Sequence, residues 1–114
     1  MKKNLIDGAV WFDMNDEGVK CHLWMRILCS INETGSISGT AQQMRTSYSK
    51  IYNEIVKLNC AAKQKLVVSA RGGVGGGFAE LTIEGHQIVK VYNEAQKQFD
   101  QFIKEMNKNL EPFF

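Results

Sequence analysis

The chain has 114 residues, 44% of them hydrophobic and 23% charged, which is ordinary for a single globular domain spanning residues 1–114. No run approaches the roughly eighteen apolar residues that a membrane span needs, and no apolar stretch follows the first lysines. We therefore expect no membrane segment, no signal peptide and a cytoplasmic location. The three cysteines form no C-x-x-C pair, which argues against a disulfide framework and a zinc site.

Basic residues are concentrated in the middle of the chain. Residues 36–71 carry six basic residues against one acidic residue, Glu54, which is a net charge of +5. Residues 1–35 carry four basic and five acidic residues, and residues 72–114 carry four and six, so these flanks sum to −3. This distribution indicates a surface that meets a polyanion, although a solvated basic face would have the same composition.

The first predicted elements are a short strand and a helix. Val10–Met14 alternates loosely and is followed by the turn-rich residues NDEG, which favours a strand or hairpin. Residues 22–33 have helical apolar spacing, and Thr34-Gly35 supplies a stop. The apolar positions of this helix are Leu23, Trp24, Ile27, Leu28 and Ile31.

A helix-turn-helix is predicted over residues 36–59. Ser36 or Ser38 can cap its first helix, and Ser47 can cap its second helix after a break at Arg45-Thr46. The small Ala41 suits the place where the two helices cross. The buried positions predicted for the pair are Ile37, Ala41, Met44, Ile51, Ile55 and Leu58.

A β-hairpin is predicted over residues 66–81, because two strand-like runs flank Arg71–Gly77, which holds five of the ten glycines. Thr82 can then cap a long helix reaching about residue 108. Its apolar positions recur in steps of four and three, the spacing of a coiled-coil seam, which predicts a homodimer. The predicted dimer interface comprises Ile88, Tyr92, Ala95, Phe99, Phe102 and Met106.

These elements predict a mainly α fold with a small β-hairpin: a winged helix-turn-helix plus a long C-terminal dimerisation helix. The exposed face of the third helix is polar and basic, as in helices that read base edges in the major groove. Free backbone amides at Thr46 and Ser47 could hold a phosphate, and Arg71 on the wing could hold another. The predicted residues that bind double-stranded DNA are Ser38, Thr46, Ser47, Tyr48, Ser49, Lys50, Tyr52, Asn53, Lys57, Arg71, Gly72 and Gly73.

A plainer interpretation remains open for both motifs. A three-helix core with a polar outer face would show the same periodicity, and the glycine run could be only a mobile turn. That run lacks the lysine of a nucleotide P-loop and is followed by a strand rather than a helix. His22 and His86 stand apart from any metal-binding or catalytic spacing. We therefore expect no enzyme, no cofactor and no metal site.

The segment ETGSISGTAQQMRTSYSKIYNEIVKLN, followed by RGGVGGGFAELTIEG, resembles the N-terminal DNA-binding domain of molybdate-responsive regulators of the ModE type. The helix-turn-helix part is also similar to that of LysR-type regulators. The resemblance covers about residues 9–105, and its most specific feature is an ordered set of motifs. These are GSIS, the pair Ser47-Tyr48, the glycine wing and the LT-x-x-G at Leu81–Gly85. The resemblance implies a dimeric regulator that binds palindromic operator DNA through Ser47–Lys57 and the wing.

The sequence departs from this family pattern in two ways. The family usually has a tryptophan where this chain has Tyr52, so base preference is expected to differ. Members that sense molybdate carry separate C-terminal oxyanion-binding domains, whereas this sequence ends at Phe114, so molybdate binding by it is not supported. The alternative function is a dimeric protein-interaction module on the same scaffold, for which the aromatic pair Tyr48 and Tyr52 would form a contact patch.

Overall fold

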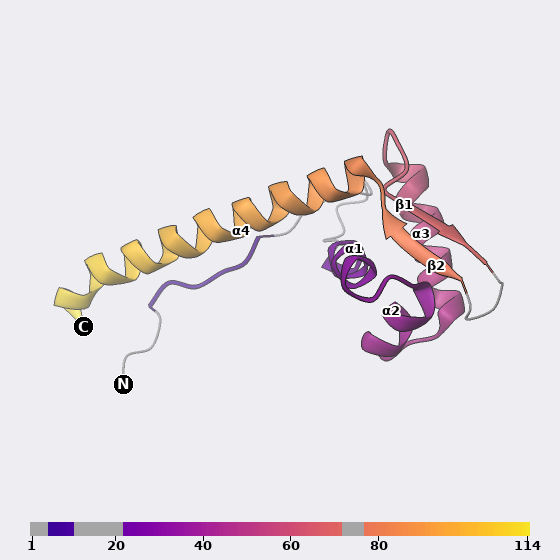
Figure 1. Ribbon diagram of the computed structural model, residues 1–114. Helices are drawn as coiled ribbons and strands as arrows, with labels where there is room; N and C mark the ends of the chain where they lie inside the picture. The colour runs from indigo at the N-terminus through magenta and orange to yellow at the C-terminus, as the bar shows by residue number, and fades with distance from the viewer. Residues whose placement is uncertain (1–4, 11–21, 72–76) are drawn as a thin grey trace.

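A computed structural model describes residues 5–10, 22–71 and 77–114 of the chain. Three helices are followed by a two-stranded hairpin and a long helix (Figure 1). The elements are α1 (His22–Thr34), α2 (Ile37–Gln43), α3 (Tyr48–Ala61), β1 (Val67–Ala70), β2 (Phe78–Leu81), α4 (Ile83–Leu110) and a terminal 3-10 turn, η1 (Glu111–Phe113). The first three helices and the hairpin form a compact unit, here called the head, from which α4 projects.

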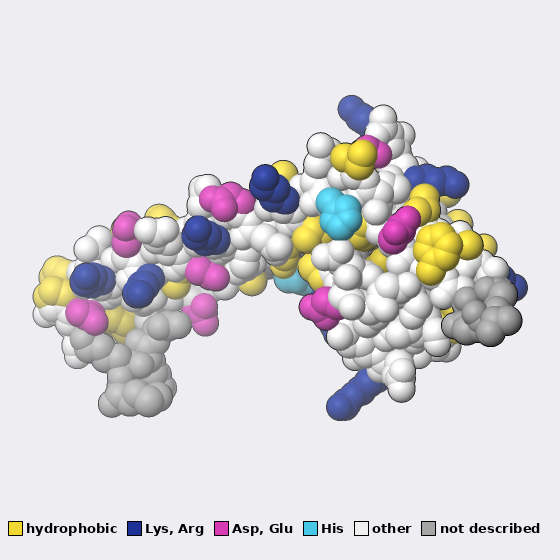
Figure 2. Space-filling model, in the orientation of Figure 1, with side chains coloured by type: hydrophobic (Ala, Val, Ile, Leu, Met, Phe, Trp, Pro, Cys, Tyr) yellow, Lys and Arg dark blue, Asp and Glu magenta, His cyan; other side chains and the backbone are white. Residues whose placement is uncertain are grey.

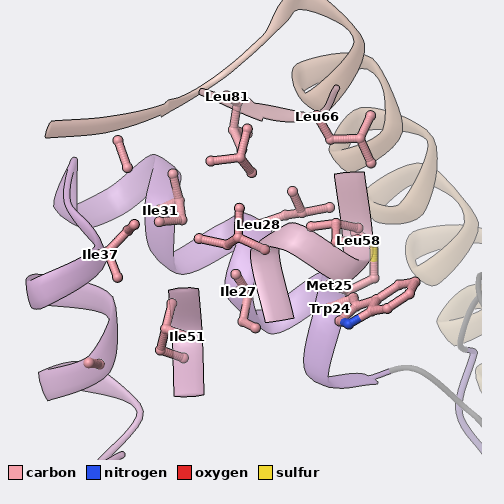
Figure 3. Packing of buried hydrophobic residues seen from close by; sticks show 14 residues of the cluster. Trp24, Met25, Ile27, Leu28, Ile31, Ile37, Ile51, Leu58, Leu66 and Leu81 are labelled. Atoms are coloured by element: carbon pink, nitrogen blue, oxygen red, sulfur yellow. The ribbon is translucent and has the colours of Figure 1, made fainter. Parts of the chain in front are cut away.

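The head is built around one apolar core to which every one of its elements contributes. Ile27 and Leu28 of α1 and Ile51 of α3 have no exposed surface, and Leu81 of β2 closes the core from the hairpin side. Figure 3 shows these side chains converging from the different elements. The helical spacing of the apolar residues explains this packing, because positions three and four apart share one face of a helix.

Two left-handed residues shape the turns between the first three helices. Gly35 (φ 74°) ends α1, and the Ser36 side chain then caps α2 by accepting a hydrogen bond of 2.8 Å from the Gly39 amide. Arg45 (φ 56°) lies in the turn between α2 and α3. A left-handed conformation strains a residue that has a Cβ atom, so the turn at Arg45 carries a cost that the one at Gly35 does not.

The hairpin is tied to the helices through backbone and side-chain hydrogen bonds. Its antiparallel register pairs Val67 with Leu81 and Ala70 with Phe78. The Asn59 side chain of α3 donates to the Val67 carbonyl at 3.0 Å and accepts from the Leu66 amide at 2.9 Å. These bonds fix the wing beside the end of α3.

α4 leaves the head as a rod of 28 residues, about 42 Å long at the helical rise. Thr82 caps it by accepting from the Gly85 amide at 3.0 Å. Near its start Ile88, Val89 and Tyr92 pack against the head core. Farther along, residues 5–10 run beside it (Figure 1).

The Asn107 side chain ties residues 5–6 to α4. The Asn107 carboxamide accepts hydrogen bonds from the amides of Leu5 (2.7 Å) and Ile6 (2.8 Å) and donates to the Ile6 carbonyl at 2.9 Å. A Cβ atom on Gly8 would lie only 3.0 Å from the Phe99 ring, so glycine permits the close approach there. Two parts of the chain about a hundred residues apart thus lie in contact.

The predicted fold class is confirmed: the protein is mainly helical, with a two-stranded wing and a long C-terminal helix. The Ser47 and Thr82 caps are confirmed, and Ser36 rather than Ser38 caps α2. Most of the strand predicted at Val10–Met14 lies outside the described residues. Among the residues described, no helix has the length and apolar character needed to cross a membrane.

Candidate DNA interface

The outward face of α3 is largely polar. Ser47 accepts a hydrogen bond of 3.1 Å from the Lys50 amide and so starts the helix at Tyr48. Because Ile51, Ile55 and Leu58 fill the core, helical geometry turns Ser49, Asn53, Val56 and Lys57 outward, and all four are exposed. This face offers hydroxyl, carboxamide and ammonium groups in the first two and a half turns of the helix.

One flank of α3 faces the wing and is aromatic. The rings of Tyr48 and Tyr52 stack with centroids 6.4 Å apart and an interplanar angle of 10°, and the Arg71 guanidinium lies 6.0 Å from the Tyr48 centroid. A cation above an aromatic face is attracted by the ring quadrupole, which positions Arg71 beside the helix. The wing and α3 therefore present one joined surface.

A shallow cavity of about 180 Å³ lies where α2, α3 and the wing meet. Ser38 of α2, both tyrosines of α3 and Arg71 of the wing line it, together with Ser69 and Phe78. Four of the predicted DNA-binding residues are thus brought to one concave place. The cavity offers hydroxyl donors and one fixed positive charge, which is the donor set that a phosphate group binds.

The other flank of α3 faces α1 and carries a buried carboxylate. Glu54 has only 7% of its surface exposed. Its Oε1 accepts a hydrogen bond of 3.0 Å from the Trp24 indole, and its Oε2 lies 3.3 Å from the Lys50 ammonium and 3.5 Å from the Lys57 ammonium. Burial alone would raise the pKa of Glu54, but the Trp24 hydrogen bond and the two lysines outweigh it and lower this pKa below its ordinary value of 4.5.

The structure changes the interpretation of three predicted residues. The Thr46 amide is not free, because it donates to the Ala41 carbonyl at 2.9 Å to close the turn, so only its exposed side chain could meet a phosphate. Lys50 and Lys57 are exposed but are drawn toward Glu54 rather than extended into solvent. Gly72 and Gly73 lie outside the described residues.

Sequence reasoning missed the contact between Glu54 and the buried Trp24 beneath this surface. A glutamate with lysines four residues before it and three residues after it on one helix is a visible signal of ion pairing. The burial of Glu54 was not visible, because its indole partner lies thirty residues earlier. The left-handed Arg45 was also missed, since it occupies a position that glycine or asparagine usually fills.

The predicted dimer residues on α4 differ in exposure along the helix. Ile88 and Tyr92 are half-buried against the head, and Phe99 is half-buried beside Gly8. Phe102 keeps 53% of its surface exposed, and its ring lies 6.5 Å from that of Phe99. Ala95 and Met106 are half-buried. The seam is thus partly covered within one chain and open at Phe102.

Within residues 5–10, 22–71 and 77–114, no three histidine, cysteine or acidic side chains lie close enough to hold a metal ion. The Cys29 side chain is half-buried. Burial, together with the nearby Glu33 charge, raises the pKa of the Cys29 thiol above its ordinary value of 9.0 and so disfavours the reactive thiolate.

Comparisons of sequence relate the chain to regulators of the ModE type. It is 37% identical over 78 residues to "Transcriptional regulator ModE" of Yersinia pestis, a match that covers 65% of this chain and 30% of that protein. It is 30% identical over 86 residues to "Molybdenum transport protein ModE" of Azotobacter vinelandii, covering 75% of this chain and 32% of that protein. The chain thus spans about a third of the length of these relatives. No family model matches it.

Comparisons of structure give the same fold from more distant proteins. The BenM_DBD/benA site 1 DNA complex matches with a TM-score of 0.53 and 18% sequence identity, covering 74% of this chain and 89% of that one. ArgP from Mycobacterium tuberculosis matches with a TM-score of 0.53 and 20% identity, covering 72% of this chain and 29% of that one. At these identities the likeness establishes the winged helix-turn-helix fold.

Proposed function

From the homology of most of this chain to ModE-type regulators, we propose that it is the DNA-binding part of a transcription regulator. Related proteins are described as transcriptional regulators, and a neighbour of the same fold is described in complex with DNA. The observation that carries the proposal is the continuous surface formed by the polar face of α3 and the Tyr48–Arg71 contact with the wing. The proposed action is binding without catalysis, in the cytoplasm.

In the proposed complex α3 enters the major groove. Ser49 and Asn53 would meet base edges, since both are exposed and can donate and accept hydrogen bonds. Arg71 and the hydroxyl groups around the cavity would hold backbone phosphates and fix the register of the helix. Lys50 and Lys57 would supply the electrostatic part of the affinity, which carries no sequence information.

We also propose that the protein acts as a homodimer through α4. The exposed Phe102 and its neighbour Phe99 provide apolar surface that a second copy of the helix would cover. A two-fold axis through this helix would place two recognition helices about 34 Å apart, one turn of DNA. The expected binding site is therefore an inverted repeat.

The proposal assigns DNA binding, and not molybdate binding, to these 114 residues. The relatives whose names mention molybdenum are about three times as long as the segment that matches them. Isothermal calorimetry of the purified chain with sodium molybdate is expected to show no saturable heat. Tight binding of molybdate would contradict this assignment.

The test of DNA binding is selection from a random duplex library at near-physiological salt, followed by affinity measurements on the enriched sequence. We expect Asn53→Ala to lower the preference for the enriched over a scrambled duplex. Lys57→Ala should weaken both duplexes alike, about five-fold, because it removes one phosphate contact. Lys104→Ala, an exposed lysine far along α4, is the matched control and should change neither affinity.

One result would refute the proposal outright: no enriched sequence, together with equal retention of duplex, single strand and heparin.

The exposed pair Tyr48 and Tyr52 favours the second candidate function, a protein-interaction surface. That function predicts a co-purifying protein that Tyr52→Ala releases, with no duplex affinity near physiological salt.

A further inference from the structure

Glu54 stands out on the proposed DNA surface because it is the one acidic residue among residues 36–71. A carboxylate next to a DNA-binding face repels phosphate, and burial of a charged group costs free energy unless partners compensate. The structure supplies three partners, one indole and two ammonium groups. Packing alone therefore does not explain why a charged, buried carboxylate lies at this position.

The two carboxylate oxygens of Glu54 bind different partners. Oε1 faces the core and accepts the hydrogen bond from Trp24, whose side chain is 4% exposed. Oε2 faces outward and holds the Lys50 and Lys57 ammonium groups, whose side chains are 53% and 67% exposed. The indole fixes the carboxylate in place, whereas the two lysine side chains lie mostly in solvent and can reorient toward another anion.

The same two lysines adjoin the residue proposed to read bases. Lys50 precedes Asn53 by three residues and Lys57 follows it by four, so both are its neighbours on the helix surface. Each lysine thus stands between the proposed reading residue and Glu54. A DNA backbone beside α3 would offer its phosphates to the two ammonium groups that Glu54 already holds.

We propose that Glu54 is an affinity-setting residue that acts as an internal substitute for DNA phosphate. In the free protein it neutralises one of the two positive charges, and in the complex it competes with the backbone for Lys50 and Lys57. It thereby weakens binding to every duplex equally and leaves the sequence-reading contacts to decide between sites. This inference rests on the proposed function, since it concerns the strength of the proposed DNA contact.

The decisive variant is Glu54→Gln, which keeps an oxygen to accept from Trp24 and removes the charge. The chain would then present one more uncompensated positive charge to DNA. The slope of log K against log salt should become more negative by about 0.9, and affinity at ~0.15 M salt should rise about five-fold. These changes should be equal for the enriched and the scrambled duplex, so their affinity ratio stays constant.

Trp24→Phe is the matched structural control. It removes the hydrogen bond to Glu54 and keeps an aromatic ring in the core, so the charges on α3 are unchanged. We expect Trp24→Phe to lower the melting temperature without steepening the salt slope. The readout is fluorescence anisotropy of each labelled duplex across a salt series, with thermal melting of every variant.

These experiments distinguish a failure of the inference about Glu54 from a failure of the proposed DNA binding. If the wild-type chain binds duplex but Glu54→Gln has the same salt slope and no gain in affinity, Glu54 only anchors the helix and the inference fails. The same conclusion follows if Trp24→Phe and Glu54→Gln weaken binding to the same extent. If the wild-type chain binds no duplex at any salt concentration, the proposed function fails first and the inference fails with it.

Discussion

The head and the α4 rod of this protein use their apolar residues in different ways. Within the part of the chain that the structure describes, all fourteen apolar residues of the buried core lie between Trp24 and Leu81, in the head. Along the 28 residues of α4 only Gly85 is buried. The head therefore has a core of its own, whereas the rod gains its stability from its junction with the head, from residues 5–10 and from local contacts.

The polar contacts show the same contrast. In the head several of them link elements distant in sequence, such as Trp24 with Glu54 and Asn59 with the wing. On the rod several are one turn apart, as between Gln98 and Glu94, and Figure 2 shows acidic and basic side chains interspersed along it. Pairs of this kind stabilise a helix by only a few tenths of a kcal/mol, about 0.2–0.5 each. The distal rod is thus the part that a second copy would stabilise most.

The head and the rod should differ most in how much one isoleucine side chain contributes to the free energy of unfolding. Ile51→Ala in the head removes a side chain with no exposed surface and should lower the free energy of unfolding by about 2–5 kcal/mol. Ile83→Ala, the matched change at the start of α4 where the side chain is 73% exposed, should alter it by less than ~0.5 kcal/mol. Urea unfolding followed by tryptophan fluorescence measures both. Equal losses would contradict the contrast between head and rod.

The next effect concerns assembly and should appear only on the rod. Phe102→Glu places a charge at the open position of the proposed seam and forfeits the burial of an aromatic side chain, about 1.5–3 kcal/mol for each copy. Sedimentation equilibrium should show the wild type as a dimer and this variant as a monomer with an unchanged head. Gln101→Glu adds the same charge at the neighbouring exposed position and should stay dimeric. A wild-type monomer at all concentrations would disprove the dimer.

The stability of the head should depend on pH through the Glu54 carboxylate. Because the pKa of Glu54 lies below its ordinary value of 4.5 in the folded state, folding favours the charged carboxylate. The stability it contributes is present above pH 4.5 and is lost as the pH falls through the lowered folded pKa. Glu54→Gln should therefore lose less stability than the wild type between neutral pH and pH 4 or below. Thermal melting across that range measures it, and parallel curves would show that Glu54 contributes nothing.

The sequence predicted those features of the molecule that depend on neighbours along the chain. Periodicity placed Ile51, Ile55 and Leu58 in the core, and the structure confirms it. The Ser47 cap depends on a residue three positions away, so local rules identified it. The fold class followed from the order of such elements, without knowledge of their contacts.

The features that the sequence did not predict depend on residues far apart. Local rules place a glutamate of α3 in solvent, and only the indole of α1 explains why Glu54 is buried. In the same way the free amide expected at Thr46 is occupied by the Ala41 carbonyl across the turn. The hydrogen bonds between Asn107 and residues 5–6, here called the clasp, join positions 101 or 102 residues apart, which no periodic pattern can predict.

A smaller effect tests whether residues 5–10 belong to the rod. Asn107→Ala removes both acceptor contacts to the Leu5 and Ile6 amides, each contributing about 0.5–1.5 kcal/mol. Hydrogen exchange at these two amides should therefore accelerate, while the melting of the head stays the same. Asn109→Ala, at an exposed site on the same turn, is the control. Unchanged exchange in Asn107→Ala would show that the clasp does not hold the segment.

The weakest change is expected at Gly35 and Arg45, the left-handed residues that end α1 and α2 in the described part of the head. Arg45→Gly should raise the free energy of unfolding by about 0.5–1 kcal/mol, because glycine adopts a positive φ without strain. Gly35→Ala should lower it by a similar amount through conformation alone, since a Cβ atom there meets nothing within 4 Å. Thermal unfolding of the two variants tests this opposition. If Arg45→Gly gains stability and loses duplex affinity, the strain at Arg45 is retained because its charge contacts DNA, whereas a loss of stability would show that the turn is not strained.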